Sequence, residues 1–214
     1  MNLAFSDNQI ILASTLFILS LAPFLIIIGT PFLKFIVIIG ILKNALGIQQ
    51  IPPNMALSAI ALILAAISMT PTSYQIADNF NKGLINYKSE NFVEQVRVYA
   101  LEPYRDYLKK NTSTKNIIFF KNEMEKRSNG IIISDKSLLI LLPSYLLDQL
   151  QEAFTIGFLL YLPFIAIDLI ISNILLALGM MMVSPVTISI PFKILLFIVI
   201  GGWKEVFSSL LDIS

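Results

Sequence analysis

Residues 154–192 read FTIGFLLYLPFIAIDLIISNILLALGMMMVSPVTISIPF and carry one charged side chain, Asp168, in the whole run. The same bias extends over the chain, because 56% of its 214 residues are hydrophobic and only 14% are charged. Soluble domains average about 25% charged residues, and the mean hydropathy here is +0.79. The chain has too little polar surface to cover its apolar residues in water. We expect its apolar segments to face lipid, partner subunits or both.

The composition excludes several classes of function. The chain has no Cys and no His, which removes disulfides, thiolate metal sites and the commonest general base. A formal net charge of +1 gives no reason to expect nucleic acid as a partner. Gly201–Gly202 is not a phosphate-binding loop, and Asp148 and Glu152 are interpreted as the polar stripe of an amphipathic helix. We expect no enzymatic activity, no metal and no cofactor.

Charged residues divide the chain into three segments. Residues 71–137 hold 11 of the 15 basic and 8 of the 14 acidic side chains, so we expect a soluble, partly helical segment. Residues 1–70 are expected to form apolar helices and a hairpin, and residues 138–214 are expected to form apolar hairpins. Within the charged segment, the apolar spacing predicts a helix that ends at Glu102–Pro103 and a second short helix from Tyr104.

The run at residues 10–28 has no charge and is long enough to cross a hydrocarbon core as a helix. No basic residue precedes it, so no cleavable secretory signal is predicted. The connection at residues 29–54 carries Lys34 and Lys43 and no acidic residue, which places it in the cytoplasm by the positive-inside rule. The chain is therefore predicted to cross the membrane four times, with both termini and the charged segment on the outer side.

Prolines and glycines are expected to interrupt the apolar segments. Gly29-Thr30-Pro31 marks one break, Pro52-Pro53 stops a helix, and Asn54 is expected to cap the next one. A broken helix exposed to hydrocarbon leaves unsatisfied backbone groups, which cost several kcal/mol each. We therefore predict an all-α protein of membrane-associated helical hairpins that pack against other subunits.

Asp168 and Lys193 are the isolated charges among the apolar residues of the C-terminal half. An ionisable residue in such a setting is by default a functional hypothesis. The two side chains could pair across a hairpin, or each could bond a partner subunit. Alternatively they lie at helix ends near water, with Lys193 reaching the surface. A structural pair or an end anchor is favoured over a proton relay.

Met180, Met181 and Met182 stand between Gly179 and Pro185. Three consecutive residues on a regular helix point about 100° apart and cannot share one face, while the flanking Gly and Pro favour a helix break. The methionines are expected in a loop or at a hairpin tip. Because methionine is flexible and apolar, a ring of such loops could close a narrow opening as a gasket. From the residues alone, filling of an ordinary hydrophobic core is the stronger interpretation.

Two ordered sets of motifs resemble a known family. The first is LKNALGIQQIPPN at residues 42–54, and the second comprises AFTIGF at 153–158, LPF at 162–164, ID at 167–168, GMMM at 179–182, PFK at 191–193 and GW at 202–203. Both are similar to signatures of the FliP/SctR (YscR, SpaP) proteins of type III export machines. The first set supplies a hairpin or turn motif made of Lys43, Asn44, Gln49, Gln50, Pro52, Pro53 and Asn54.

The resemblance implies that the chain is a core subunit of an export gate and crosses the bacterial inner membrane several times. It also implies that much of the complex lies on the periplasmic side. It further implies that five copies of the chain form a ring-like or helical oligomer. The implied partners of this oligomer are FliQ/SctS-like and FliR/SctT-like subunits, other export apparatus proteins and the base of the needle or rod. Residues 71–137 become a periplasmic insertion, and the family's methionine constriction falls on Met180, Met181 and Met182. The missing signal favours the virulence-associated branch, the injectisome.

Three functions are compatible with these residues. The favoured one is a channel-forming subunit that passes unfolded substrate proteins through the methionine constriction. A small secondary transporter would use Asp168 and Lys193 to couple ion movement. A passive membrane scaffold would anchor other subunits and line no pore.

Overall fold

The computed structural model describes residues 12, 16, 20, 21, 23–24, 26–48, 52–86, 89, 91–127 and 134–213. Every regular element within these residues is a helix, so the all-α prediction is confirmed for them. In chain order the elements are α2 (Phe32–Ala45), α3 (Asn54–Ser68), α4 (Thr70–Asn81), α5 (Phe92–Val96), the π-helical turn η1 (Arg97–Leu101), α6 (Glu102–Lys110), α7 (Thr114–Arg127), α8 (Leu138–Ala177), α9 (Pro185–Val199) and α10 (Gly202–Ile213).

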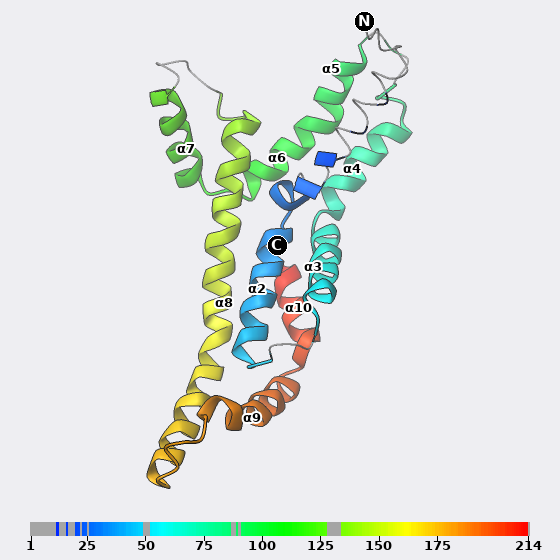
Figure 1. Cartoon of the computed structure of the whole chain (residues 1–214). Helices are drawn as coiled ribbons and strands as arrows, with labels where there is room; N and C mark the ends of the chain where they lie inside the picture. Colours follow the sequence, from blue (N-terminus) through cyan, green and yellow to red (C-terminus); the bar gives the residue numbers. More distant parts are fainter. Residues whose placement is uncertain are drawn as a thin grey trace, which may run out of the picture.

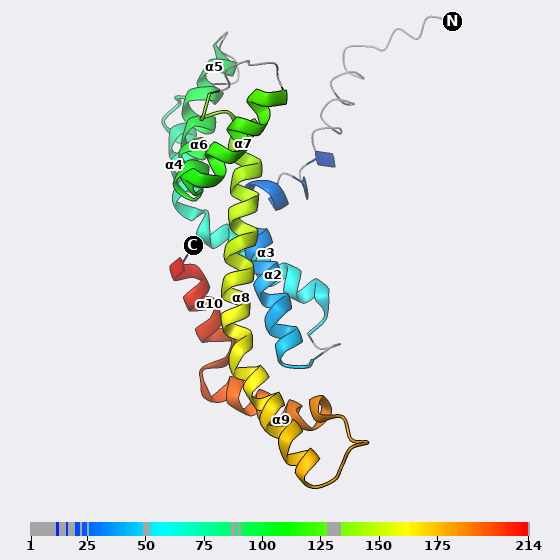
Figure 2. The same cartoon turned by 90° about the vertical axis from the view of Figure 1, so that its left-hand side faces the viewer.

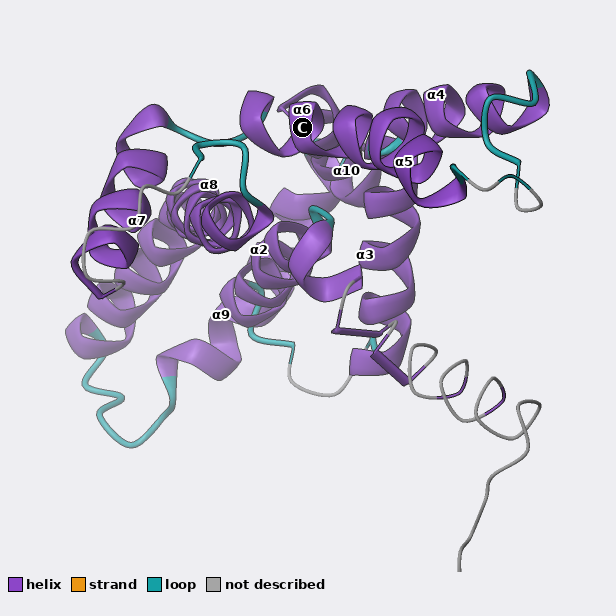
Figure 3. Ribbon diagram, turned by 90° about the horizontal axis from the view of Figure 1, so that it is seen from above, coloured by secondary structure: helices purple, strands orange, loops and turns teal. Residues whose placement is uncertain are grey.

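Helix α8 is the spine of the molecule, and α2 packs along it (Figures 1 and 2). The view from above shows α2 between α8 and α3 (Figure 3). Because α2 is covered by two neighbours, Phe35, Ile38 and Ile39 are all fully buried. Residues 29–54 are therefore not a simple connection, since residues 32–45 form a core helix whose two lysines are buried. Their cytoplasmic location stays a prediction.

The close approach of α2 and α8 depends on Gly157. A Cβ added to this glycine would lie 2.4 Å from Cδ1 of Ile41 and 3.2 Å from its Cβ and Cγ2. Gly40, on α2, differs, because a Cβ added there meets no atom within 4 Å. Packing therefore requires a glycine at position 157 and not at position 40.

We expect Gly157→Ala to destabilise the protein by about 1–3 kcal/mol, as overpacking of a core does. Gly40→Ala should be neutral or stabilising by up to about 1 kcal/mol, since Ala is the better helix former. Ile41→Ala removes Cδ1, the closest of these atoms, and Cγ2, so the Gly157→Ala/Ile41→Ala pair should lose less stability than the sum of the two single changes. Thermal unfolding in detergent measures these differences. Equal stability of Gly157→Ala and Gly40→Ala would contradict the packing described above.

The charged segment folds into α4 to α7 and shares a second hydrophobic cluster with the start of α8. The buried side chains of this cluster are Leu108 and Ile117 from the charged segment and Ile140, Leu141 and Tyr145 from α8. The segment thus packs on the N-terminal part of the spine, away from the α8–α9 hairpin (Figure 1).

The predicted helix end at Glu102–Pro103 is wrong, since α5, η1 and α6 follow one another without interruption over residues 92–110. Proline lacks the N–H that would bond the carbonyl group four residues earlier, which belongs to Tyr99. Asn79 Nδ2 of α4 donates to that carbonyl oxygen instead, at 2.9 Å. The helix can therefore pass through the proline because another helix supplies the missing donor.

Tyr104 of α6 links the charged segment to the start of α2. Its hydroxyl group donates to the carbonyl oxygen of Gly29 at 2.9 Å, and its ring stacks on that of Tyr107 with centroids 6.5 Å apart. Burial raises the pKa of Tyr104 to about 12 and also raises the pKa of Tyr107. Both hydroxyl groups therefore stay protonated near neutral pH.

Helix α8 continues through Pro143 and Pro163, so the expectation that prolines interrupt this apolar segment is wrong for α8.

Helix α8 has 40 residues and is about 60 Å long. Among the described residues, α8 is the single helix long and apolar enough to cross a membrane. Two bent pairs, α3 with α4 and α9 with α10, would each count as one span with a 60° bend, which gives up to three spans. The first of the four predicted crossings, residues 10–28, lies largely outside the described residues.

Candidate functional site

The chain turns between α8 and α9 at residues 178–184, which we call the methionine tip. In both side views the tip lies at the end of the molecule opposite α5 and α7 (Figures 1 and 2). The N–H of Gly179 donates to the carbonyl oxygen of Leu176 and that of Met180 to Leu175, at 3.0 and 2.9 Å. This pattern ends a helix through a left-handed residue, and Gly179 has φ +73°. The predicted helix break is confirmed.

The three methionines of the tip are exposed. Met180, Met181 and Met182 have relative exposures of 44%, 81% and 101%. Filling of a core within this chain, the interpretation favoured by the residues alone, is therefore wrong, because core side chains are buried. Their role as a gasket stays a prediction.

The structure places Asp168 and Lys193 against each other. Lys193 Nζ lies 2.6 Å from Asp168 Oδ2 and 3.0 Å from the carbonyl oxygen of Ala45 at the end of α2. Ser189 Oγ donates to the second carboxylate oxygen of Asp168. The side chain of Lys193 is 2% exposed and that of Asp168 is 25% exposed. One ammonium group thus connects α8, α9 and α2.

Neither charge lies at a helix end. Asp168 is in the interior of α8 and Lys193 is in the interior of α9. The end-anchor interpretation, with Lys193 reaching water, is therefore wrong. Paired in this way, the two charges leave residues 154–199, which hold no other charged side chain, without net charge.

Breaking the pair should destabilise the fold more than removing both charges. We expect Lys193→Met to cost up to about 3–5 kcal/mol, since it leaves a carboxylate without its counter-ion. Asp168→Leu/Lys193→Met should cost less than Lys193→Met alone. Ser189→Ala, which removes one hydrogen bond, should cost about 1 kcal/mol.

Thermal unfolding in detergent ranks these variants by their stability. A proton relay predicts the opposite result, in which Lys193→Met keeps full stability and loses only transport.

The first signature motif forms the turn between α2 and α3. Lys43 is buried, and its Nζ donates to the carbonyl oxygen of Pro52 and to Oδ1 of Asn54, both at 2.9 Å. The prediction that Asn54 caps α3 is wrong, because Pro53 occupies the cap position and Asn54 is the first helical residue. Asn44 is exposed and lines a hollow together with Lys43 and Asn54. Gln49 and Gln50 fall outside the described residues.

Two carboxylates have partners that the sequence did not indicate. Asp148 is buried and accepts hydrogen bonds from Ser113 N at 2.7 Å, Ser113 Oγ at 3.0 Å and Asn116 Nδ2 at 2.7 Å. It thereby holds the first turn of α7 on α8. Glu152 forms an ion pair of 3.2 Å with the buried Lys34 of α2. The polar-stripe interpretation is therefore wrong for Asp148 and incomplete for Glu152, whose partner lies far away in sequence.

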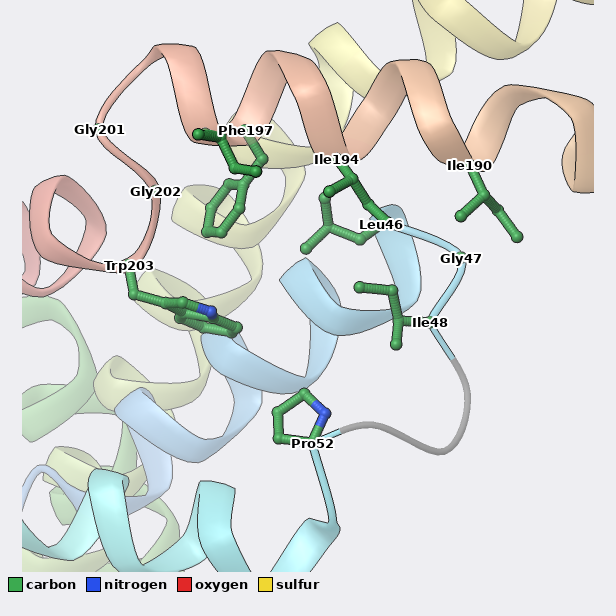
Figure 4. A pocket seen from close by; sticks show the side chains of 11 residues that line it. Leu46, Gly47, Ile48, Pro52, Ile190, Ile194, Phe197, Gly201, Gly202 and Trp203 are labelled. Atoms are coloured by element: carbon green, nitrogen blue, oxygen red, sulfur yellow. The ribbon is translucent and has the colours of Figure 1, made fainter.

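An apolar groove of about 730 Å³ separates α9 from the α2–α3 turn (Figure 4). Ile190, Ile194 and Phe197 line it from α9, and Leu46 lines it from the end of α2. Trp203 packs edge-on against Phe197, with ring centroids 5.4 Å apart. None of the described residues that line the groove is ionisable, so it suits an apolar surface. Across the described residues, no group of three His, Cys, Asp or Glu side chains could hold a metal ion.

Comparison with known proteins covers nearly the whole chain. The FliP family model matches residues 15–210. The chain belongs to the FliP family. The resemblance to FliP/SctR proteins drawn from the two sets of motifs is thereby confirmed.

Relatives in this family match at similar length. The virulence protein YscR of Salmonella typhimurium is 45% identical over 209 residues, which cover 96% of this chain and 97% of that protein. The Yop proteins translocation protein R of Yersinia pestis is 43% identical over 201 residues, with 92% and 93% covered. The surface presentation of antigens protein SpaP of Shigella flexneri is 41% identical over 209 residues, with 97% and 96% covered.

Family membership defines the general role of the chain. It is a membrane protein and a component of a type III export apparatus, where it works with other apparatus proteins. Family members are structural proteins of the export gate and not enzymes. The expectation of a protein without enzymatic activity is confirmed by this membership.

Proposed function

We propose that the chain is a channel-forming core subunit of the type III export gate, which passes unfolded substrate proteins across the bacterial inner membrane. The observation that carries the proposal is the exposure of Met180, Met181 and Met182 at the tip of the α8–α9 hairpin. Copies of the hairpin arranged in a ring bring these tips together around one axis. Flexible, apolar thioether side chains can then close the opening and deform around a passing chain.

The shape of α9 supports packing against other subunits. Its 15 residues give about 22 Å of helix, whereas a spanning helix needs about 20 residues. The chain then bends by 60° at the junction with α10. Exposed to lipid, the non-helical backbone at this bend would leave peptide groups without partners. We propose that other subunits cover this bend. They are further copies of the chain, in a pentamer, and FliQ/SctS-like and FliR/SctT-like subunits.

The proposed location rests on family membership together with the charge distribution of the chain. Residues 71–137 form a periplasmic insertion between apolar segments 1–70 and 138–214, and much of the complex lies on the periplasmic side of the inner membrane. The insertion is the part of the subunit nearest to other apparatus proteins and the base of the needle or rod. The names of the relatives, which refer to virulence and to Yop translocation, support the virulence-associated branch.

Replacement of Met180, Met181 and Met182 by Ala should make membranes that contain the assembled gate leak small ions several-fold faster. The shorter side chains no longer fill the constriction, while the fold of each chain persists because the tip lies outside both hydrophobic clusters. Iodide uptake by inverted membrane vesicles measures the leak, and native mass measurement of the extracted complex checks assembly. Met55→Ala, at an equally exposed methionine far from the tip, is the matched control. An unchanged leak from fully assembled gates would contradict the gasket.

A Met181→Cys variant separates a channel from a passive scaffold. The chain has no other cysteine, so the new thiol is unique in this subunit. We expect it to form a disulfide with a cysteine placed in a substrate stalled during export, because the tip lines the path. A scaffold that lines no pore gives no such adduct, and ion transport by the isolated chain in liposomes would instead favour the secondary transporter.

A further inference from the structure

The methionine tip concentrates groups that oxidants attack. A thioether is converted to a sulfoxide by hydrogen peroxide or hypochlorous acid, and susceptibility increases with exposure. Met181 and Met182 are more than four-fifths exposed, and Met180 is nearly half exposed. We propose that the tip is an oxidative modification site, at which peroxide-class oxidants convert the methionines to sulfoxides and open the seal. This inference rests on the function proposed above.

The modification is a two-electron oxidation of sulfur. The thioether sulfur attacks one oxygen of hydrogen peroxide, the O–O bond breaks, and an S–O bond forms. The second peroxide oxygen leaves as water after proton transfer, so one peroxide yields one sulfoxide and one water. A methionine sulfoxide reductase, with a thiol as the reductant, reverses the change.

Because of the composition of the tip, methionine sulfoxides there would prevent the side chains from closing against each other without water. The tip, residues 178–184, reads LGMMMVS, and its one side chain that can donate a hydrogen bond is that of Ser184, against three methionines. A sulfoxide oxygen is a polar acceptor, and burying it without a donor is unfavourable. Sulfoxides at the tip therefore stay hydrated, and water remains where thioethers would close against each other. The seal changes from an apolar contact to a wet opening.

Other methionines of the chain provide the comparison. Met124 packs against the second hydrophobic cluster, so oxidation there is slow. Met55, in the first turn of α3, is 85% exposed, and should be oxidised as readily as the tip in the isolated chain. Oxidation of Met55 should not affect the seal, which makes it an internal control for the position of the lesion.

The experiment uses the complete gate in membrane vesicles treated with hydrogen peroxide. The variants are the wild type, Met180→Leu/Met181→Leu/Met182→Leu and Met55→Leu, since Leu keeps the apolar volume of Met and is not oxidised. Peptide mass spectrometry locates sulfoxides, and iodide uptake measures the leak. We expect a several-fold increase in leak for the wild type and Met55→Leu, none for the triple Leu variant, and return to the starting value after methionine sulfoxide reductase.

Three results would overturn the inference while leaving the gasket in place: sulfoxide at Met55 with none at the tip, sulfoxide at the tip without a leak, or an equal leak from the triple Leu variant. The triple Ala variant described above is run beside them. If that variant does not leak, the proposed gasket itself fails, and the inference fails with it. The two failures are therefore distinguishable in one experiment.

Discussion

Helix α2 can occupy the centre of the protein because each ammonium group buried around it has an acceptor within reach. Lys34 pairs with Glu152 of α8, and Lys43 holds the turn that leads to α3. Lys193 of α9 reaches the last carbonyl group of α2, at Ala45. An ammonium group buried without such partners would be strongly destabilising. These three contacts therefore set where α8, α3 and α9 lie relative to α2.

The same arrangement determines what the outside of the molecule offers. The charged side chains of α2, α8 and α9 are paired or hydrogen-bonded within the chain, as in the Asp168–Lys193 pair. Apolar side chains remain exposed along the second half of α8 and along α9, with Phe158, Leu169 and Leu195 among them. A surface of this kind is suited to lipid and to apolar faces of other subunits. Most of the hydrophobic excess of the sequence thus serves contacts beyond the single chain.

Local patterns in the sequence were sufficient for the features that depend on local physics. The Gly and Pro around the methionines predicted the hairpin tip, and apolar composition predicted an all-α membrane protein. The errors concern contacts between distant residues. Asn79 supplies the donor that lets a helix pass through Pro103, and Asp148 holds a helix that begins 34 residues earlier, at Thr114. Neither partner can be located from spacing, because the fold creates both contacts.

The length of α8 connects two parts of the molecule that perform different tasks. Its first turns belong to the hydrophobic cluster of the charged segment, and its last turn leads directly into the methionine tip. Because α8 is one continuous helix, it holds the charged segment and the methionine tip about 60 Å apart, at the two ends of a single element.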